Sequence, residues 1–186
     1  TDARLDRLQR TVEEQAIVVI AKRQPMALDL RHIFAALRVS GDLERVGDLA
    51  KSIAKRVIAM GGAVQVKSVV IGVEHLADIA LEQLKAVLDA YTARDAGAAM
   101  EVRERDEQID ALYTSLFREL LTYMMEDPRN ITFCTHLLFC AKNIERIGDH
   151  ATNVAEAVHY LVTGEQVADD RPKGNDAEQM KLEGDA

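Results

Sequence analysis

Four pairs of carboxylates are the side chains of this 186-residue sequence best placed to do chemistry. Within each pair the two acids are four residues apart, so on an α-helix they point about 40° from each other on one face. Like charges in that position repel by roughly 0.2–0.5 kcal/mol per pair in an isolated helix. A multivalent cation would reverse the repulsion, because clustered carboxylate oxygens are hard metal ligands. The candidate metal ligands are Asp2, Asp6, Glu44, Asp48, Asp106, Asp110, Glu145 and Asp149.

The four pairs belong to an internal repeat. The motif Glu-Arg-Val-Gly-Asp at 44–48 recurs as Glu-Arg-Ile-Gly-Asp at 145–149, 101 positions later, and seven of the fourteen positions that begin with the motif are identical. The upstream acidic pairs match at an offset of 104, and Pro25 matches Pro128 at an offset of 103. Each copy therefore predicts a carboxylate-bearing helix, a proline turn and a longer helix that carries the motif.

The glycine inside each motif, Gly47 or Gly148, favours a binding site. A residue without a side chain lets an ion, a water molecule or a neighbouring helix approach the backbone, although it costs about 1 kcal/mol of helix stability relative to alanine. The alternative is that the acids lie on ordinary solvated helix faces, with Arg45 and Arg146 as loose partners. The helical phase places the motif acids away from the apolar stripe, so a metal site would lie on the outside of the bundle. Spacing alone leaves both interpretations open.

The elements that must position these acids are long helices. Of the residues 48% are hydrophobic but only 4% aromatic, which is typical of packed helices. Apolar residues recur at intervals of three and four, and no alternating strand pattern competes with them. The sequence predicts an all-α protein with helical runs through 5–19, from Pro25 to Gly61, through 73–91, through 102–124, and through 144–161 to an end at Gly164.

The repeat also sets the expected domain boundaries. Residues 1–62 form a first repeat with two helices, and residues 63–164 form a second repeat whose two helices follow an additional leading helix at 67–91. The first repeat is therefore expected to lack the counterpart of that leading helix. Residues 165–186 hold seven acidic and three basic residues, and we expect them to form a disordered tail.

Charge and composition exclude several functions. A net charge of −8 and a pI near 5.2 argue against nucleic-acid binding, which needs a basic surface. Cys134 and Cys140 would lie about 240° apart around a helix, so they share neither a metal nor an easy disulfide. Two free thiols are typical of the reducing cytoplasm. No apolar stretch approaches the roughly 20 residues of a membrane span, so we expect no direct insertion and a membrane link only through a partner.

Histidine gives little support for catalysis. Asp29 precedes His32 by three residues and Glu156 precedes His159 by three, as in the ligand pairs of carboxylate-bridged di-metal bundles. Neither pair is repeated in the other copy, and His150 corresponds to a leucine there. No Ser/His/Asp arrangement, phosphate-binding glycine loop or zinc-type cysteine spacing is present. A ferritin-like di-metal enzyme and a metal-free helical scaffold are kept as alternatives.

Both copies resemble the repeats of the PhoU family of phosphate-uptake regulators. The segment from Gln24 to Ala50 resembles the first repeat of that family, and the segment from Arg103 to Ala155 resembles the second, so the resemblance covers residues 1–164. It implies two tandem three-helix bundles related by a pseudo-twofold axis. It also implies multinuclear clusters of iron or zinc, with manganese, magnesium or calcium as further candidates, on the eight acids named above.

The same resemblance implies a function without catalysis. The resemblance implies a cytoplasmic, homodimeric adaptor that regulates phosphate uptake and represses phosphate-starvation signalling. The implied partners are a sensor histidine kinase and the ATPase subunit of the phosphate ABC transporter. No nucleic acid is expected among the partners.

Overall fold

The computed structural model describes residues 2–61 and 67–167, and all of these except residue 2 have described side chains. Within these residues all the regular secondary structure is helical. The predicted all-α class is confirmed. None of the described helices has the length and hydropathy needed to cross a membrane. The elements are α1 (Asp2–Arg23), α2 (Ala27–Ala59), α3 (Lys67–Ala93), α4 (Ala96–Glu104), α5 (Asp106–Glu126), the 3-10 helix η1 (Pro128–Asn130) and α6 (Ile131–Thr163).

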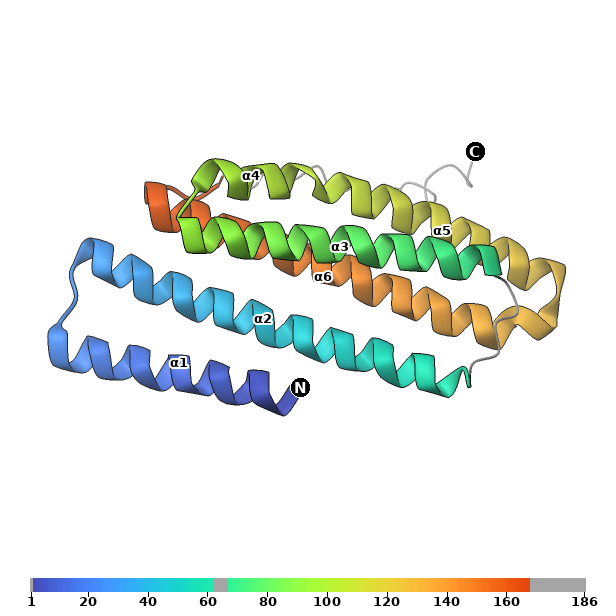
Figure 1. The fold of residues 1–186 in the computed structure, drawn as a ribbon, viewed down its shortest axis with the longest axis horizontal. Helices are drawn as coiled ribbons and strands as arrows, with labels where there is room; N and C mark the ends of the chain where they lie inside the picture. The colour runs from blue at the N-terminus through green and yellow to red at the C-terminus, as the bar shows by residue number, and fades with distance from the viewer. Residues whose placement is uncertain (1, 62–66, 168–186) are drawn as a thin grey trace, which may run out of the picture.

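The two longest helices, α2 and α6, hold the molecule together. Each has 33 residues, and they pack against each other along the middle of the structure. Figure 1 shows α1 folded back on α2 as a helical hairpin, whereas α3 and α5 lie with α6 as a three-helix bundle. The helices that carry the acidic pairs, α1 with α2 and α5 with α6, are thus neighbours in both repeats.

The helix ends follow the predicted glycine and proline signals. Helix α6 ends at Gly164, whose φ of +79° is a left-handed conformation that other residues adopt at a cost. Pro128 opens the short turn before α6, and Pro25 lies in the turn between α1 and α2. Proline lacks the amide hydrogen that a continuing helix needs, so both hairpins turn where the chain has proline.

The predicted helical run through 102–124 is interrupted at Arg105, which separates α4 from α5. The buried side chain of Gln83 on α3 donates from Nε2 to the carbonyl oxygen of Arg105 at 2.9 Å, and so satisfies a backbone group at the break. Asp95 caps α4 by accepting a hydrogen bond from the Ala98 amide at 3.0 Å. The apolar spacing does not reveal this contact between distant residues.

Two apolar cores lie along α6. The larger one fills the bundle of α3, α5 and α6 around the fully buried Leu76, Ile109 and Leu120. The smaller one joins α2, α3, α4 and α6. The α1–α2 hairpin is less covered: Ile17 is 67% exposed and Phe34 is 51% exposed. The first repeat therefore buries less apolar surface than the second.

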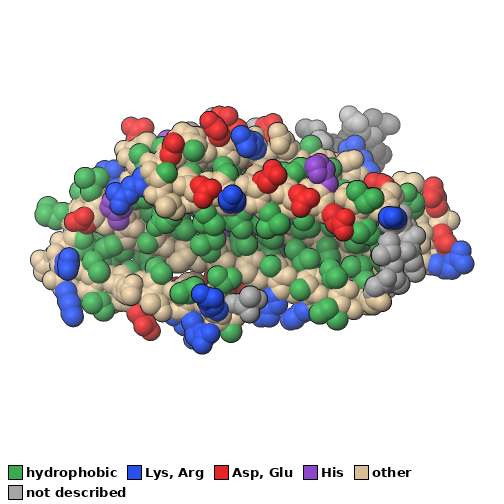
Figure 2. Space-filling view, in the orientation of Figure 1, with side chains coloured by type: hydrophobic (Ala, Val, Ile, Leu, Met, Phe, Trp, Pro, Cys, Tyr) green, Lys and Arg blue, Asp and Glu red, His purple; other side chains and the backbone are tan. Residues whose placement is uncertain are grey.

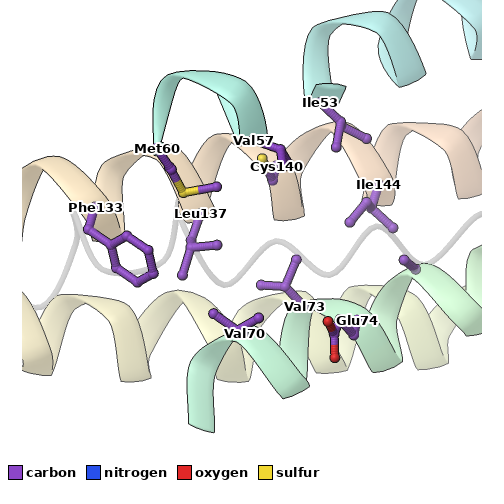
Figure 3. Close-up of a pocket in the computed structure, with 11 residues that line it drawn as sticks. Ile53, Val57, Met60, Val70, Val73, Glu74, Phe133, Leu137, Cys140 and Ile144 are labelled. Atoms are coloured by element: carbon purple, nitrogen blue, oxygen red, sulfur yellow. The ribbon is translucent and has the colours of Figure 1, made fainter. Parts of the chain in front are cut away.

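An apolar pocket of about 320 Å³ lies between α2, α3 and α6 (Figure 3). Figure 2 shows the band of hydrophobic side chains that runs between α2 and α3. Val57 and Cys140 in the pocket wall correspond in the repeat to Val158 and Val39, which pack with Val87 of α3 in the smaller core. Equivalent positions of the repeat therefore line a pocket at one place and are packed in a core at the other.

Candidate functional site

Each motif glycine is a point where a neighbouring helix approaches closely. A Cβ atom added to Gly148 would lie 2.8 Å from Cδ1 of Ile109, and one added to Gly47 would lie 2.5 Å from Cδ1 of Leu5. Leu5 and Ile109 are equivalent in the repeat, at the offset of 104. The structure therefore places α1 on α2 as it places α5 on α6, with an acidic pair on each helix of the seam.

The second seam carries four acids, two on α5 and two on α6. Oδ1 of Asp106 lies 3.3 Å from the position of a Cβ on Gly148. Burial raises the pKa of Glu145, and the nearby charges of Asp149 and Asp110 raise it further. The ion pair with Lys142 lowers this pKa but does not cancel the increase. All four side chains are half-buried. We call Asp106, Asp110, Glu145 and Asp149 the second acidic site.

The side chain of Glu145 is mostly enclosed by its neighbours. Its side chain is 12% exposed, and Oε1 accepts an ion-paired hydrogen bond from Nζ of Lys142 at 2.7 Å. Its other oxygen, Oε2, is buried and has no hydrogen-bond partner within the described residues. A buried carboxylate oxygen without a partner is costly, so this atom has capacity for a ligand.

The first seam is more open. Glu44 has a 20% exposed side chain and lies 3.6 Å from Nε of Arg45, whose own side chain is 67% exposed. Asp6 and Asp48 are half-buried, and the side chain of Asp2 lies outside the described residues. We call Asp2, Asp6, Glu44 and Asp48 the first acidic site. Arg45 matches the loose partner that the solvated-face alternative expects.

The two acidic sites offer oxygen donors suited to a hard cation, although the side chains do not converge as they stand. Among residues 2–61 and 67–167, no three acid, imidazole or thiol groups are arranged to hold one metal ion. Two observations nevertheless fit a cation at the second acidic site: the unpartnered Oε2 of Glu145, and the side-chain-free surface of Gly148 beside Asp106. The raised pKa of Glu145, caused first by burial and then by the charges of Asp149 and Asp110, also disfavours an ordinary solvated face for this residue.

The residues of the di-metal alternative have other partners. Glu156 pairs with Arg103 of α4 at 3.5 Å, and Nδ1 of His159 lies 3.1 Å from the carbonyl oxygen of Glu165 beyond the end of α6. Neither side chain turns to a shared bundle core. The two cysteines are free and buried, and burial raises the pKa of both thiols.

The sequence predictions did not include the polar contacts of Asp42 with α6 or the ion pair of Lys142 with Glu145. His150 Nδ1 lies 2.8 Å from Oδ1 of Asp42, which also accepts from Asn153 Nδ2 at 3.3 Å, so a polar contact joins α6 to α2. The residues are 108 positions apart, and no local signal pairs them. Lys142, by contrast, lies three residues before Glu145 on the same helix face, and that spacing could have predicted the ion pair.

Comparison with known proteins gives consistent similarities. A model of the PhoU domain matches residues 1–57 and 73–158. The chain is 64% identical over 172 residues, 92% of its length and 73% of the relative's, to a "phosphate-specific transport system accessory protein PhoU homolog" of Rhizobium meliloti strain 1021. The crystal structure of PhoU from Pseudomonas aeruginosa superposes with a TM-score of 0.83 at 37% identity, covering 88% of this chain and 78% of that one. The "phosphate transport system regulatory protein PhoU" from Streptococcus pneumoniae superposes with a TM-score of 0.81 at 29% identity, covering 90% and 78%.

Proposed function

The chain belongs to the PhoU family, and from this premise we propose that it is a non-catalytic adaptor that regulates phosphate uptake. The names of its relatives support the proposal, because one is called an accessory protein and another a regulatory protein of a phosphate transport system. The bundle suits such a task, since long helices with exposed side chains offer extended docking surfaces.

We further propose that the adaptor acts in the cytoplasm as a homodimer and represses phosphate-starvation signalling. Its partners are a sensor histidine kinase and the ATPase subunit of the phosphate ABC transporter. Support comes from the resemblance of both repeats to the family and from the exposed apolar residues Ile17 and Phe34 on the hairpin, which a partner could cover.

Metal binding at the two acidic sites is the chemical part of the proposal. The observation that carries it is the repeated seam, in which a glycine of one helix meets an apolar side chain of the next in both repeats, flanked each time by acids. In this proposal the two repeats are residues 1–62 and 63–164, and each of them contains one acidic site. A multinuclear cluster of iron or zinc, or of manganese, magnesium or calcium, would neutralise the crowded carboxylates. It would also hold in place the surface that a partner binds.

Elemental analysis of the purified protein tests the metal sites. The double change Glu145→Ala/Asp149→Ala should leave the helix content near normal and remove the metal bound at the second acidic site. A matched control is Glu74→Ala/Asp78→Ala, an exposed pair with the same spacing on α3, which should change neither. Equal metal content in the two double variants would show that these acids do not hold the metal, and no stoichiometric metal in the parent would favour the metal-free scaffold. Global unfolding of the first variant would mean that these acids hold the fold.

Co-purification tests the adaptor role. The full chain is mixed with the detergent-solubilised histidine kinase and with the transporter ATPase, and we expect it to be retained with both. Cells without the protein should express phosphate-starvation genes constitutively. A normally repressed level in high phosphate, together with no retention by either partner, would contradict the proposal.

A further inference from the structure

The outer side of the α5–α6 hairpin carries four exposed apolar side chains that belong to neither apolar core. Met125 is 84% exposed, Ile131 47%, Leu121 39% and Phe117 37%. We call these four residues the α5–α6 apolar face. Apolar side chains that are exposed singly are ordinary, whereas a group of them on one side of a protein marks an interaction surface.

The α5–α6 apolar face lies on the same side of the hairpin as the second acidic site. On α5, Phe117 and Leu121 lie within about 20° of Asp110 around the helix. On α6, Ile131 lies about 40° around the helix from Glu145. The acids and the apolar residues therefore follow each other along one line, with the apolar residues toward the turn of the hairpin.

A row of contacts joins the acids to the apolar residues. Nζ of Lys142 lies 2.7 Å from Oε1 of Glu145 and 5.0 Å from the ring centroid of Tyr113. The ring centroid of Tyr113 lies in turn 6.4 Å from that of Phe117. The surface is thus continuous from the second acidic site to the α5–α6 apolar face, and it runs about 28 Å along α5.

The first hairpin has a shorter apolar surface at the corresponding place. Leu121 corresponds to Ile17 at the offset of 104, and both side chains are exposed. Phe117, however, corresponds to Glu13, which is charged. The longer apolar surface is therefore a feature of the second repeat.

We propose that the α5–α6 apolar face docks an amphipathic helix of a partner protein, whose lysine or arginine side chains lie at the second acidic site. The inference rests on the proposed adaptor role and gives the chemistry of one partner. A helix matches a straight surface of this length with apolar side chains three and four residues apart. Its basic end follows from charge complementarity, because the second acidic site places four carboxylates beside the ammonium of Lys142. The inference concerns the protein without bound metal, in which these carboxylates keep their charge.

The same charges disfavour two other occupants. An anionic lipid surface would be repelled by the acids that share this side of the hairpin. A second copy of the chain that presented the same surface in the same direction would bring four acids against four. In the opposite direction it would set its acids beside Glu126 at the turn. A basic helix from another protein avoids these repulsions.

Selection of peptides on the full chain in the presence of EDTA tests the chemistry of the occupant. The library holds random peptides of about 18 residues, which as helices span the length of the surface. Peptides that the parent retains and that Leu121→Gln/Met125→Gln does not retain are sequenced. We expect apolar residues at i, i+3 or i+4, and i+7, with lysine or arginine at one end. Enrichment of peptides without this pattern, or of none, overturns the proposal.

The affinities of the enriched peptides test the place of docking. Leu121→Gln/Met125→Gln should weaken binding by at least about tenfold, because it removes two apolar contacts. Met125→Gln alone, at an 84% exposed position that the fold does not need, should weaken binding by about threefold. The matched control is Ile71→Gln/Leu81→Gln, two exposed apolar residues on α3, which should change the affinity by less than about twofold. Equal affinities of the parent and both Met125 variants overturn the docking surface.

A change of charge tests the basic end. The parent should bind an enriched peptide at least about tenfold more tightly than the same peptide with glutamate in place of its basic residues. Asp106→Asn/Asp110→Asn should lose most of this preference. Equal binding of the two peptides by the parent overturns the basic end of the partner.

Two further measurements test the other occupants. Binding of the parent to phosphatidylglycerol vesicles, or a dimer in solution, overturns the proposal if Leu121→Gln/Met125→Gln abolishes it, because the surface then belongs to a lipid or to a second copy. The adaptor role fails separately, if the parent retains neither the histidine kinase nor the transporter ATPase. Retention of either by the parent and equally by the double variant overturns the docking surface and leaves the adaptor role intact.

Discussion

Replacement of Gly148 by alanine measures how tightly the α5–α6 seam is packed. A methyl group there would lie 2.8 Å from Cδ1 of Ile109 and 3.3 Å from Oδ1 of Asp106. Ile109 is fully buried and has little freedom to move, so the clash should cost about 1–3 kcal/mol. Alanine returns about 1 kcal/mol through its higher helix propensity. The expected net effect is a loss of about 1 kcal/mol, or about 2–4 °C in Tm.

Two matched glycines on α2 make the measurement specific. Gly41→Ala meets nothing within 4 Å and should stabilise the protein by about 1 kcal/mol. Gly47→Ala meets the end of the half-buried Leu5, which can turn aside, so its net effect should be near zero. Urea unfolding followed by far-UV circular dichroism ranks the three variants. If Gly148→Ala stabilises the protein as much as Gly41→Ala does, the close seam is refuted.

Two further predictions concern buried titratable groups. In the metal-free protein, burial raises the pKa of Glu145 above its ordinary value of 4.5. The folded state therefore holds this proton more tightly than the unfolded state does. The stability that results is lost as the pH rises through the raised pKa. Glu145→Gln should therefore be more stable than the parent near neutral pH and equal to it at about pH 4, as urea titrations at both pH values would show; a variant less stable at neutral pH would contradict this. Because burial raises the pKa of Cys134 and Cys140, both thiols should react with a thiol reagent at least about tenfold more slowly in the folded protein than in urea, and equal rates would show that the core around them opens readily.

Local patterns predicted the helices because their causes are local. Apolar spacing, Pro25, Pro128 and Gly164 each act within a few residues, and the structure confirms the helices that they delimit. The break at Arg105 escaped prediction, and the carbonyl there accepts hydrogen bonds both from the Gln108 amide and from the buried side chain of Gln83, 22 residues away. A contact of that kind leaves no periodic trace in the sequence.

The candidate site divides in the same way. The repeat of the Glu-Arg-x-Gly-Asp motif by itself predicts two sets of four acids, and the matching α1–α2 and α5–α6 pairings follow from it because equivalent sequences fold into equivalent hairpins. Only the tertiary structure decided how buried each acid is, that an oxygen of Glu145 has no partner among the described residues, and that Lys142 lies between Glu145 and Tyr113. Burial and the effect of neighbouring charges depend on which helices pack together. The sequence alone does not give the distances between side chains on different helices.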